Sequence, residues 1–409
     1  MRKFAVIWII ALVAVVQFSG YAAAQQQNCM GKPDSDWESR IAACTAVIKA
    51  SKGQGKDLAA AFGNRGNAYF AKAQYDRAIQ DLDQAIKLDP DYAAAFCNRG
   101  SAYFGKAQYD RAIQDFDHAI KLDPNLALAF SNRGNAYSRQ RQYDRALQDL
   151  DQAIKLDPSY AIAFAGRGNA YYGKGRYNHA IRDLDQAIKL DPNFALAFNW
   201  RGNAYDDKGE HDRAIQDYDQ AIKLNPNLAT AFNDRGLAYY RKAEYDRAIE
   251  DLDQAIKLDP TYAAAFDNRG SSYDDKGQHD RAMQDLDQAI KLDPTYAEAF
   301  NDRCWSRTIV GRELDQALKD CNESLRLRPD NGDTLDTRGF TYFKLDQYDN
   351  AIADYDVVLK LNPKVATSLY GRGLAKQRRG DAAGGEEDIV AAKAIEPKIA
   401  DKLAGYGVK

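Results

Sequence analysis

The sequence predicts an all-α protein, an α-solenoid in which one helix pair is repeated along most of the chain. Prolines recur every 34 residues from Pro90 to Pro294, and others follow at 329, 363 and 397. Between the prolines, apolar or small residues form two triplets spaced i, i+4, i+7, and each triplet therefore occupies one face of a helix. A fixed period of this length is typical of stacked repeats.

Each repeat is predicted to contain a helix, a short turn and an antiparallel second helix. With Ala59 as position 1, ten repeats run to Pro397, and the eighth has one extra residue. The turn of the second repeat is "GKAQYD", which contains a small residue. The motif "LDP" ends the second helix, because proline disfavours helical geometry in the residue before it.

The period, the alanines and the closing proline resemble those of the tetratricopeptide repeat family. The resemblance covers residues 59–397. Phe or Leu occupies position 4, where the family usually has a larger aromatic residue, and this leaves the expected fold unchanged. The resemblance implies a right-handed superhelix of antiparallel helix pairs that binds peptide or protein segments in a concave groove.

Two charged positions are the same in all ten repeats. Position 7 is arginine, from Arg65 to Arg372, and position 23 is aspartate, from Asp81 to Asp388. Because the two helices run antiparallel, these side chains can meet beside the tightest helix contact. We expect a structural ion pair that fixes helix register, and the alternative is a charged ladder that binds ligands.

The two ends differ from the repeats. Arg2, Lys3, an apolar run over 4–16 and small residues up to Ala24 predict that 1–24 is a signal peptide. An uncleaved anchor is the alternative, although the run is shorter than the roughly 20 residues that span a bilayer. Residues 25–58 are expected to form a capping half-repeat, with a helix near 33–50, and a linker. Residues 398–409 are expected to form a C-terminal capping segment.

Composition limits the possible partners. The chain is 45% hydrophobic and 28% charged, as expected for an ordered protein. Its formal charge is −3, and loss of Arg2 and Lys3 with the signal peptide makes it −5. This acidic balance disfavours a nucleic-acid partner, which needs a basic surface. We expect an exported protein, periplasmic or secreted, with no membrane span after cleavage.

The sequence carries no recognisable catalytic, cofactor or metal motif. The four histidines form no metalloprotease pattern. The stretch "GSAYFGKA" at 100–107 has the spacing of a phosphate-binding loop, but it ends in alanine and lies in a predicted helix and its turn. Two adjacent aspartate pairs, 206–207 and 274–275, lack the loop that calcium requires. We therefore expect no catalytic residues, no cofactor and no metal.

The resemblance implies that positions 2, 5, 6, 9, 12 and 13 of the first helices line the groove. Asparagine both donates and accepts hydrogen bonds, so a row of asparagines could hold the backbone of an extended peptide while aromatic residues take its side chains. A similar ladder lines the repeat region of O-linked N-acetylglucosamine transferase. The alternative is that duplication has simply repeated a polar surface residue. The predicted groove residues are Asn64, Asn67, Phe70, Asn98, Phe104, Asn132, Asn135, Asn169, Tyr172 and Asn203.

From the fifth repeat onward the same positions become acidic. A concave surface of one sign focuses the electrostatic potential, so we expect a partner to bring a basic segment to this half. The acidic series is Asp206, Asp207, Asp234, Asp267, Asp274, Asp275, Glu298, Asp302, Asp333 and Asp336.

The five cysteines predict two disulfides and one free thiol. Cys304 occupies position 8, which is glycine in the other nine repeats, and Cys321 occupies position 24, which is otherwise apolar. Both positions face the seam between the two helices, so we expect a disulfide, the alternative being two small buried residues. Cys29 and Cys44 form a similar second pair, and disulfides suit an exported chain. Cys97 at position 5 is either an incidental change or a thiol that joins a partner.

These features together predict a non-catalytic scaffold for protein-protein interaction. The alternative function is a structural spacer or assembly protein of the cell envelope, acting through end-to-end or convex-face contacts. The partner, the pathway and the oligomeric state are left open.

Overall fold

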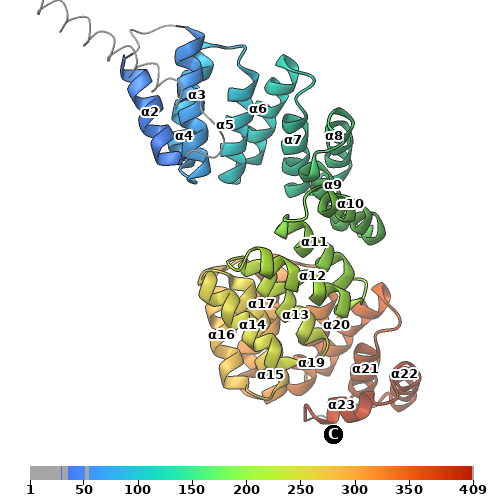
Figure 1. The fold of residues 1–409 in the computed structure, drawn as a ribbon. Coiled ribbons are helices and arrows are strands. Elements are labelled where there is room, and N and C mark those ends of the chain that lie inside the picture. The colour runs from blue at the N-terminus through green and yellow to red at the C-terminus, as the bar shows by residue number, and fades with distance from the viewer. Residues whose placement is uncertain (1–28, 30–35, 51–54, 408–409) are drawn as a thin grey trace, which may run out of the picture. The chain divides into compact units, whose positions relative to one another are not determined.

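A computed structural model describes residues 29, 36–50 and 55–407 (Figure 1). Every regular element in this part of the chain is an α-helix, which confirms the predicted all-α class. The predicted signal peptide lies outside the described residues. None of the described helices is both long enough and apolar enough to cross a membrane.

The chain divides into two compact units between Asp207 and Lys208. The helices of the N-terminal unit are α2 (Trp37–Ala50), α3 (Lys56–Ala71), α4 (Tyr75–Leu88), α5 (Ala93–Gly105), α6 (Tyr109–Leu122), α7 (Ala127–Arg139), α8 (Tyr143–Leu156), α9 (Ala161–Gly173), α10 (Tyr177–Leu190) and α11 (Ala195–Asp206).

The C-terminal unit begins after Asp207. Its helices are α12 (His211–Leu224), α13 (Ala229–Arg241), α14 (Tyr245–Leu258), α15 (Ala263–Asp275), α16 (His279–Leu292), α17 (Ala297–Val310), α18 (Leu314–Leu327), α19 (Gly332–Lys344), α20 (Tyr348–Leu361), α21 (Ala366–Arg378), α22 (Ala382–Ile395) and α23 (Ile399–Ala404).

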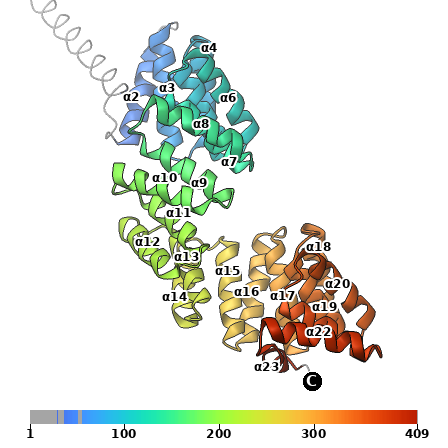
Figure 2. The same cartoon turned by 90° about the vertical axis from the view of Figure 1, so that its right-hand side faces the viewer.

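First and second helices alternate in register with the sequence period (Figures 1 and 2). We call the odd-numbered helices from α3 to α21 first helices and the even-numbered helices from α4 to α22 second helices. Within each unit a first helix packs on its second helix, and successive first helices also contact one another. The turn between them needs a left-handed residue, which is Ala73 in the first repeat (φ 54°) and Gly175 in the fourth (φ 69°).

The tightest contact of each pair lies at position 8. A Cβ atom added to Gly134 would lie 2.8 Å from Leu150 Cγ and 3.1 Å from the Ala146 carbonyl oxygen. Leu150 and Ala146 are fully buried. Glycine at this position therefore lets the two helices approach closely.

Helices outside the repeats cover both ends. At the N-terminus α2 packs on α3, and Asp36 caps α2 by accepting the backbone N–H of Ser39 at 3.1 Å. At the C-terminus α23 buries Ile399 and Leu403. Tyr406 packs edge-on against Trp305, with 5.1 Å between ring centroids. These helices cover apolar faces that terminal repeats would otherwise expose.

Candidate binding surface

The candidate surface is the first-helix face, defined as the side chains at positions 2, 5, 6, 9, 12 and 13 of the first helices. Its positions differ in depth. Position 5 is small or polar and buried through the seventh repeat, because successive first helices meet there. These residues are Gly63, Cys97, Ser131, Ala165, Asn199, Asn233 and Asp267.

Asparagines at positions 6 and 9 lie partly exposed along the N-terminal unit. Asn132 donates a hydrogen bond to Ser101 Oγ at 3.2 Å, and Asn203 lies partly exposed on α11. The other predicted asparagines make no side-chain hydrogen bond within the described part of the chain, so their amides can bind water or a ligand. They are Asn64, Asn67, Asn98, Asn135 and Asn169.

The aromatic residues at position 12 are partly used by the fold. Phe104 packs against Tyr109, which begins the following second helix, with ring centroids 5.4 Å apart. In the same way Phe70 packs against Tyr75 and Tyr172 against Tyr177, and each of these tyrosines begins the following second helix. Tyr172 also donates its hydroxyl to Asp207 at 2.7 Å. These three rings are half-buried.

Cys97 is a buried thiol and does not line an open surface. It is 1% exposed, and burial raises its pKa to about 12. A thiol of this kind is largely protonated at neutral pH and a poor nucleophile. The structure therefore favours the incidental change over a thiol that joins a partner.

Four of the acidic residues that the sequence placed on this face form two adjacent pairs and differ in accessibility. Asp207 and Asp275 are exposed, whereas Asp206 and Asp274 are buried. Asp274 accepts Ser306 Oγ at 3.0 Å and contacts His279 Nδ1 at 2.9 Å. Burial raises its pKa, and these two neighbours partly oppose the increase. Asp274 therefore joins helices as well as adding negative charge.

Asp267 on α15 and Asp302 on α17 form a second acidic pair. The sequence predicted both on an open groove surface, but Asp267 is buried and Asp302 is only partly exposed. Tyr296 donates its hydroxyl to Asp267 at 3.1 Å. Asp302 accepts Ser271 Oγ at 2.9 Å and Asn301 Nδ2 at 3.1 Å. Burial and then the Asp302 carboxylate raise the pKa of Asp267 well above its usual range. Burial also raises the pKa of Asp302, to about 6.

The predicted ion pair between positions 7 and 23 is confirmed within the units. In the third repeat, Arg133 donates from Nε and Nη2 to the two oxygens of Asp149, both at 2.7 Å. Sequence reasoning missed a second acceptor, Asp117 of the preceding repeat, which binds Arg133 Nη1 at 2.6 Å. The signal was present, because position 25 is aspartate in most repeats.

One guanidinium therefore fastens each repeat to the one before it. The same bridge recurs between Arg99 and Asp83, between Arg269 and Asp253, and between Arg372 and Asp356. Since the arginine uses both ends of its guanidinium internally, this ladder is structural. It supplies no free charge for a ligand.

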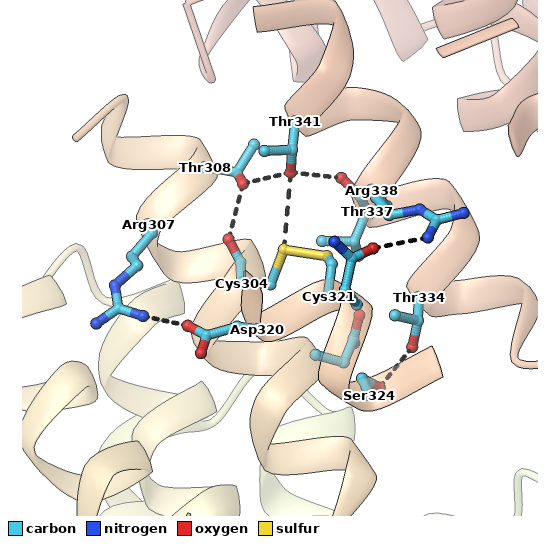
Figure 3. Close-up of a disulfide and its surroundings, with 12 residues drawn as sticks. Cys304, Arg307, Thr308, Asp320, Cys321, Ser324, Thr334, Thr337, Arg338 and Thr341 are labelled. Atoms are coloured by element: carbon cyan, nitrogen blue, oxygen red, sulfur yellow. Dashed lines mark hydrogen bonds and ion pairs between the residues drawn. A yellow bond between two sulfur atoms is a disulfide. The ribbon is translucent and has the colours of Figure 1, made fainter. Parts of the chain in front are cut away.

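The structure places both predicted cysteine pairs at disulfide distance. Cys304 and Cys321 join α17 to α18 with 2.08 Å between sulfurs, and both are fully buried (Figure 3). Hydroxyl side chains surround this bond, including Thr308 and Thr341, whose oxygens lie 2.7 Å apart. The sulfur atoms of Cys29 and Cys44 lie 2.12 Å apart at the N-terminal cap.

The arrangement described so far is that of a helical-repeat protein whose first helices carry polar side chains within each unit. Family models identify the repeat. "TPR repeat" matches residues 66–107, 168–207 and 202–243, and "Tetratricopeptide repeat" matches 93–126, 127–160, 229–262, 263–296 and 333–365. The chain belongs to the tetratricopeptide repeat family.

Solved structures share the fold at low identity. The APC/C hetero-tetramer Cut9-Hcn1 aligns at TM-score 0.57 and 14% identity over 95% of this chain and 96% of that one. A human IFIT1 dimer with m7Gppp-AAAA gives 0.58 and 15% over 88% and 86%. A tetratricopeptide repeat protein from Parabacteroides merdae gives 0.52 and 18% over 63% and 99%. No curated protein matches this chain.

Proposed function

We propose that this protein is a non-catalytic interaction scaffold whose first-helix face binds extended segments of protein partners. The observation that carries the proposal is the row of asparagine amides that make no side-chain hydrogen bond to any residue the structure describes. Asn98, Asn135 and Asn169 come from three first helices, α5, α7 and α9. Each amide offers a donor and an acceptor, which match the N–H and C=O groups of an extended backbone.

Rigidity supports this mode of binding. Most arginines at position 7 hold a buried carboxylate of their own repeat and an exposed carboxylate of the preceding repeat, as Arg133 does with Asp149 and Asp117, so the face is formed before a ligand arrives. A preformed surface reduces the conformational ordering that binding must overcome on the protein's side.

The acidic residues of the C-terminal unit favour a partner with a basic segment. Asp275 is exposed, and Asp302 lies partly exposed on α17. Charges of one sign along a surface raise the local concentration of an oppositely charged segment. Binding of such a segment should weaken as salt is added.

We further propose that the protein works outside the cytoplasm, in the periplasm or beyond. Support comes from the two cysteine pairs at disulfide distance, because disulfides persist in oxidising compartments.

Affinity capture from an envelope extract tests the binding role. The test variant combines Asn98→Ala, Asn135→Ala and Asn169→Ala on the first-helix face. The matched control combines Gln80→Ala, Gln114→Ala and Gln148→Ala, three exposed amides on the second helices. We expect the control to retain the wild-type partners and the asparagine variant to lose them. Equal capture by both variants would contradict peptide binding through the asparagine row.

One observation favours an assembly role as a second candidate. Val357 and Leu361 on α20 are 46% and 65% exposed, and Val390 on α22 is 57% exposed. Exposed apolar side chains can bury themselves between copies of a chain. Light scattering separates the two functions: a monomer that captures peptides supports the scaffold, and concentration-dependent assembly without capture supports the assembly role.

A further inference from the structure

Among the described residues, no arginine or lysine pairs with the acidic residues Asp267 and Asp302, in contrast to the buried aspartates at position 23. The groups within the described residues that donate hydrogen bonds to the pair are neutral, namely Tyr296, Ser271 and Asn301. By contrast, the buried aspartates at position 23, such as Asp149, are held by arginine. The pair thus departs from the chain's own pattern.

One oxygen of the pair has no partner. Asp267 is 4% exposed, and its Oδ1 has no hydrogen bond within the described part of the chain. A buried acceptor without a donor costs about 1–3 kcal/mol, and more when it is charged. The fold therefore sustains an unfavourable arrangement here that a bound cation would relieve.

The charged groups around the pair add to its negative potential. Glu298 raises the pKa of both aspartates, and Asp274 raises that of Asp302. Glu298 is paired with Arg328 on its other side, and Asp274 is in contact with His279. Asp302 is partly exposed, so a cation can reach the pair from the solvent side.

We propose that Asp267 and Asp302 anchor an arginine side chain from the basic segment of the partner. This inference rests on the proposed binding function and specifies where the C-terminal unit recognises charge. A metal ion is disfavoured, because no cluster of three or more potential metal ligands exists among the described residues. The chain itself shows the chemistry: Arg99 bridges Asp115 and Asp83 with one guanidinium.

Substitutions that the chain already uses make the test sharp. Position 5 is asparagine in Asn199 and Asn233, and position 6 is asparagine in Asn98 and Asn268. Asp267→Asn with Asp302→Asn therefore removes both charges while keeping residues that fold at these positions. Glu250→Gln is a control, because Glu250 is exposed on a second helix where other repeats have glutamine.

The probe is a capped hexa-arginine peptide, with a hexa-citrulline peptide as its neutral counterpart, and calorimetry measures the dissociation constants. We expect the wild type and Glu250→Gln to bind hexa-arginine alike, and the double variant to bind about tenfold more weakly or worse. The hexa-citrulline peptide carries no charge, so we expect its dissociation constant to be the same for the wild type and both variants.

Equal binding of hexa-arginine by the wild type and the double variant would overturn the proposal, as would no binding by the wild type. If the pair holds a proton and not a cation, hexa-arginine will bind the wild type and the double variant equally. Either result leaves the asparagine row untouched, because the capture experiment tests that row separately. If the asparagine variant and its glutamine control captured equally while the arginine peptide still distinguished the double variant, the asparagine row would be contradicted and the arginine site would stand.

Discussion

Position 5 shows how one residue can serve the fold or a ligand. It lies where successive first helices meet, and it is buried in the first seven repeats as glycine, cysteine, serine, alanine, asparagine or aspartate. Small size is the signal shared by most of these residues. The resemblance identified the face correctly as a set of positions, but it carried no information about depth. For this reason the sequence could not foresee that Cys97, Asp206 and Asp274 are buried.

The acidic pair should make stability depend on pH. The pKa of Asp302 is raised from 3.8 to about 6 in the folded protein. A raised carboxyl pKa stabilises the fold below the unfolded value, and that contribution is lost as pH rises through about 6. We therefore expect Asp302→Asn to stabilise the C-terminal unit at pH 7 and to have little effect at pH 4.

Thermal unfolding at the two pH values measures this difference, and a gain of about 1 kcal/mol would raise the melting temperature by roughly 2–4 °C. Glu250→Gln should follow the wild type at both pH values. The pKa values of the neighbouring Asp267 and Asp274 are also raised by burial, and their titration broadens the transition. A stability gain for Asp302→Asn that is the same at pH 4 and pH 7 would contradict the account.

At the scale of the element, the helices could be predicted closely. The two apolar triplets and the proline predict where most helices begin, so α5 begins at position 1 and α6 at position 17 of their repeat. The helix α3 is an exception, because it begins at Lys56, before position 1. The link from each arginine to the preceding repeat was not predicted. Sequence analysis paired residues within one repeat, and Asp117 acts on the next repeat along the chain.

The eighth repeat shows why its two cysteines occur together. In other repeats a side chain at position 8 would collide with the residue at position 24, as Gly100 would with Phe116 at 2.7 Å. A Cβ at Cys304 is therefore compatible only with a small partner, and Cys321 is small. The bond fills the space between the two helices that leucine, phenylalanine, tyrosine or isoleucine fills in the other repeats.

This explanation predicts the effect of restoring the common pair. With Cys29→Ser and Cys44→Ser as background, reduction should destabilise the C-terminal unit by roughly 3 kcal/mol, since it reopens a 17-residue separation. Adding Cys304→Gly with Cys321→Leu should make unfolding insensitive to reductant. Cys321→Leu alone should be less stable than the double change, because leucine then meets the Cys304 side chain. Urea unfolding with and without dithiothreitol measures each value.

At the scale of the whole molecule, the sequence period predicts the repeat array but not its division. The 34-residue pattern continues without a break across Asp207 and Lys208, where the chain divides into two compact units. The family and the fold follow from the sequence because they depend on spacing. The partner does not, because it depends on which side chains of the first-helix face remain open.

The central claim is that partners bind the first-helix face and not the second helices. Site-specific photo-crosslinking tests it most directly, with a benzophenone amino acid placed at Phe104 on α5 or at Gln114 on α6. Gln114 is exposed and Phe104 half-buried, so both probes reach solvent. We expect the partner captured from an envelope extract to crosslink to the probe that replaces Phe104 and not to the probe that replaces Gln114. Crosslinking at position 114 without crosslinking at position 104 would contradict the claim.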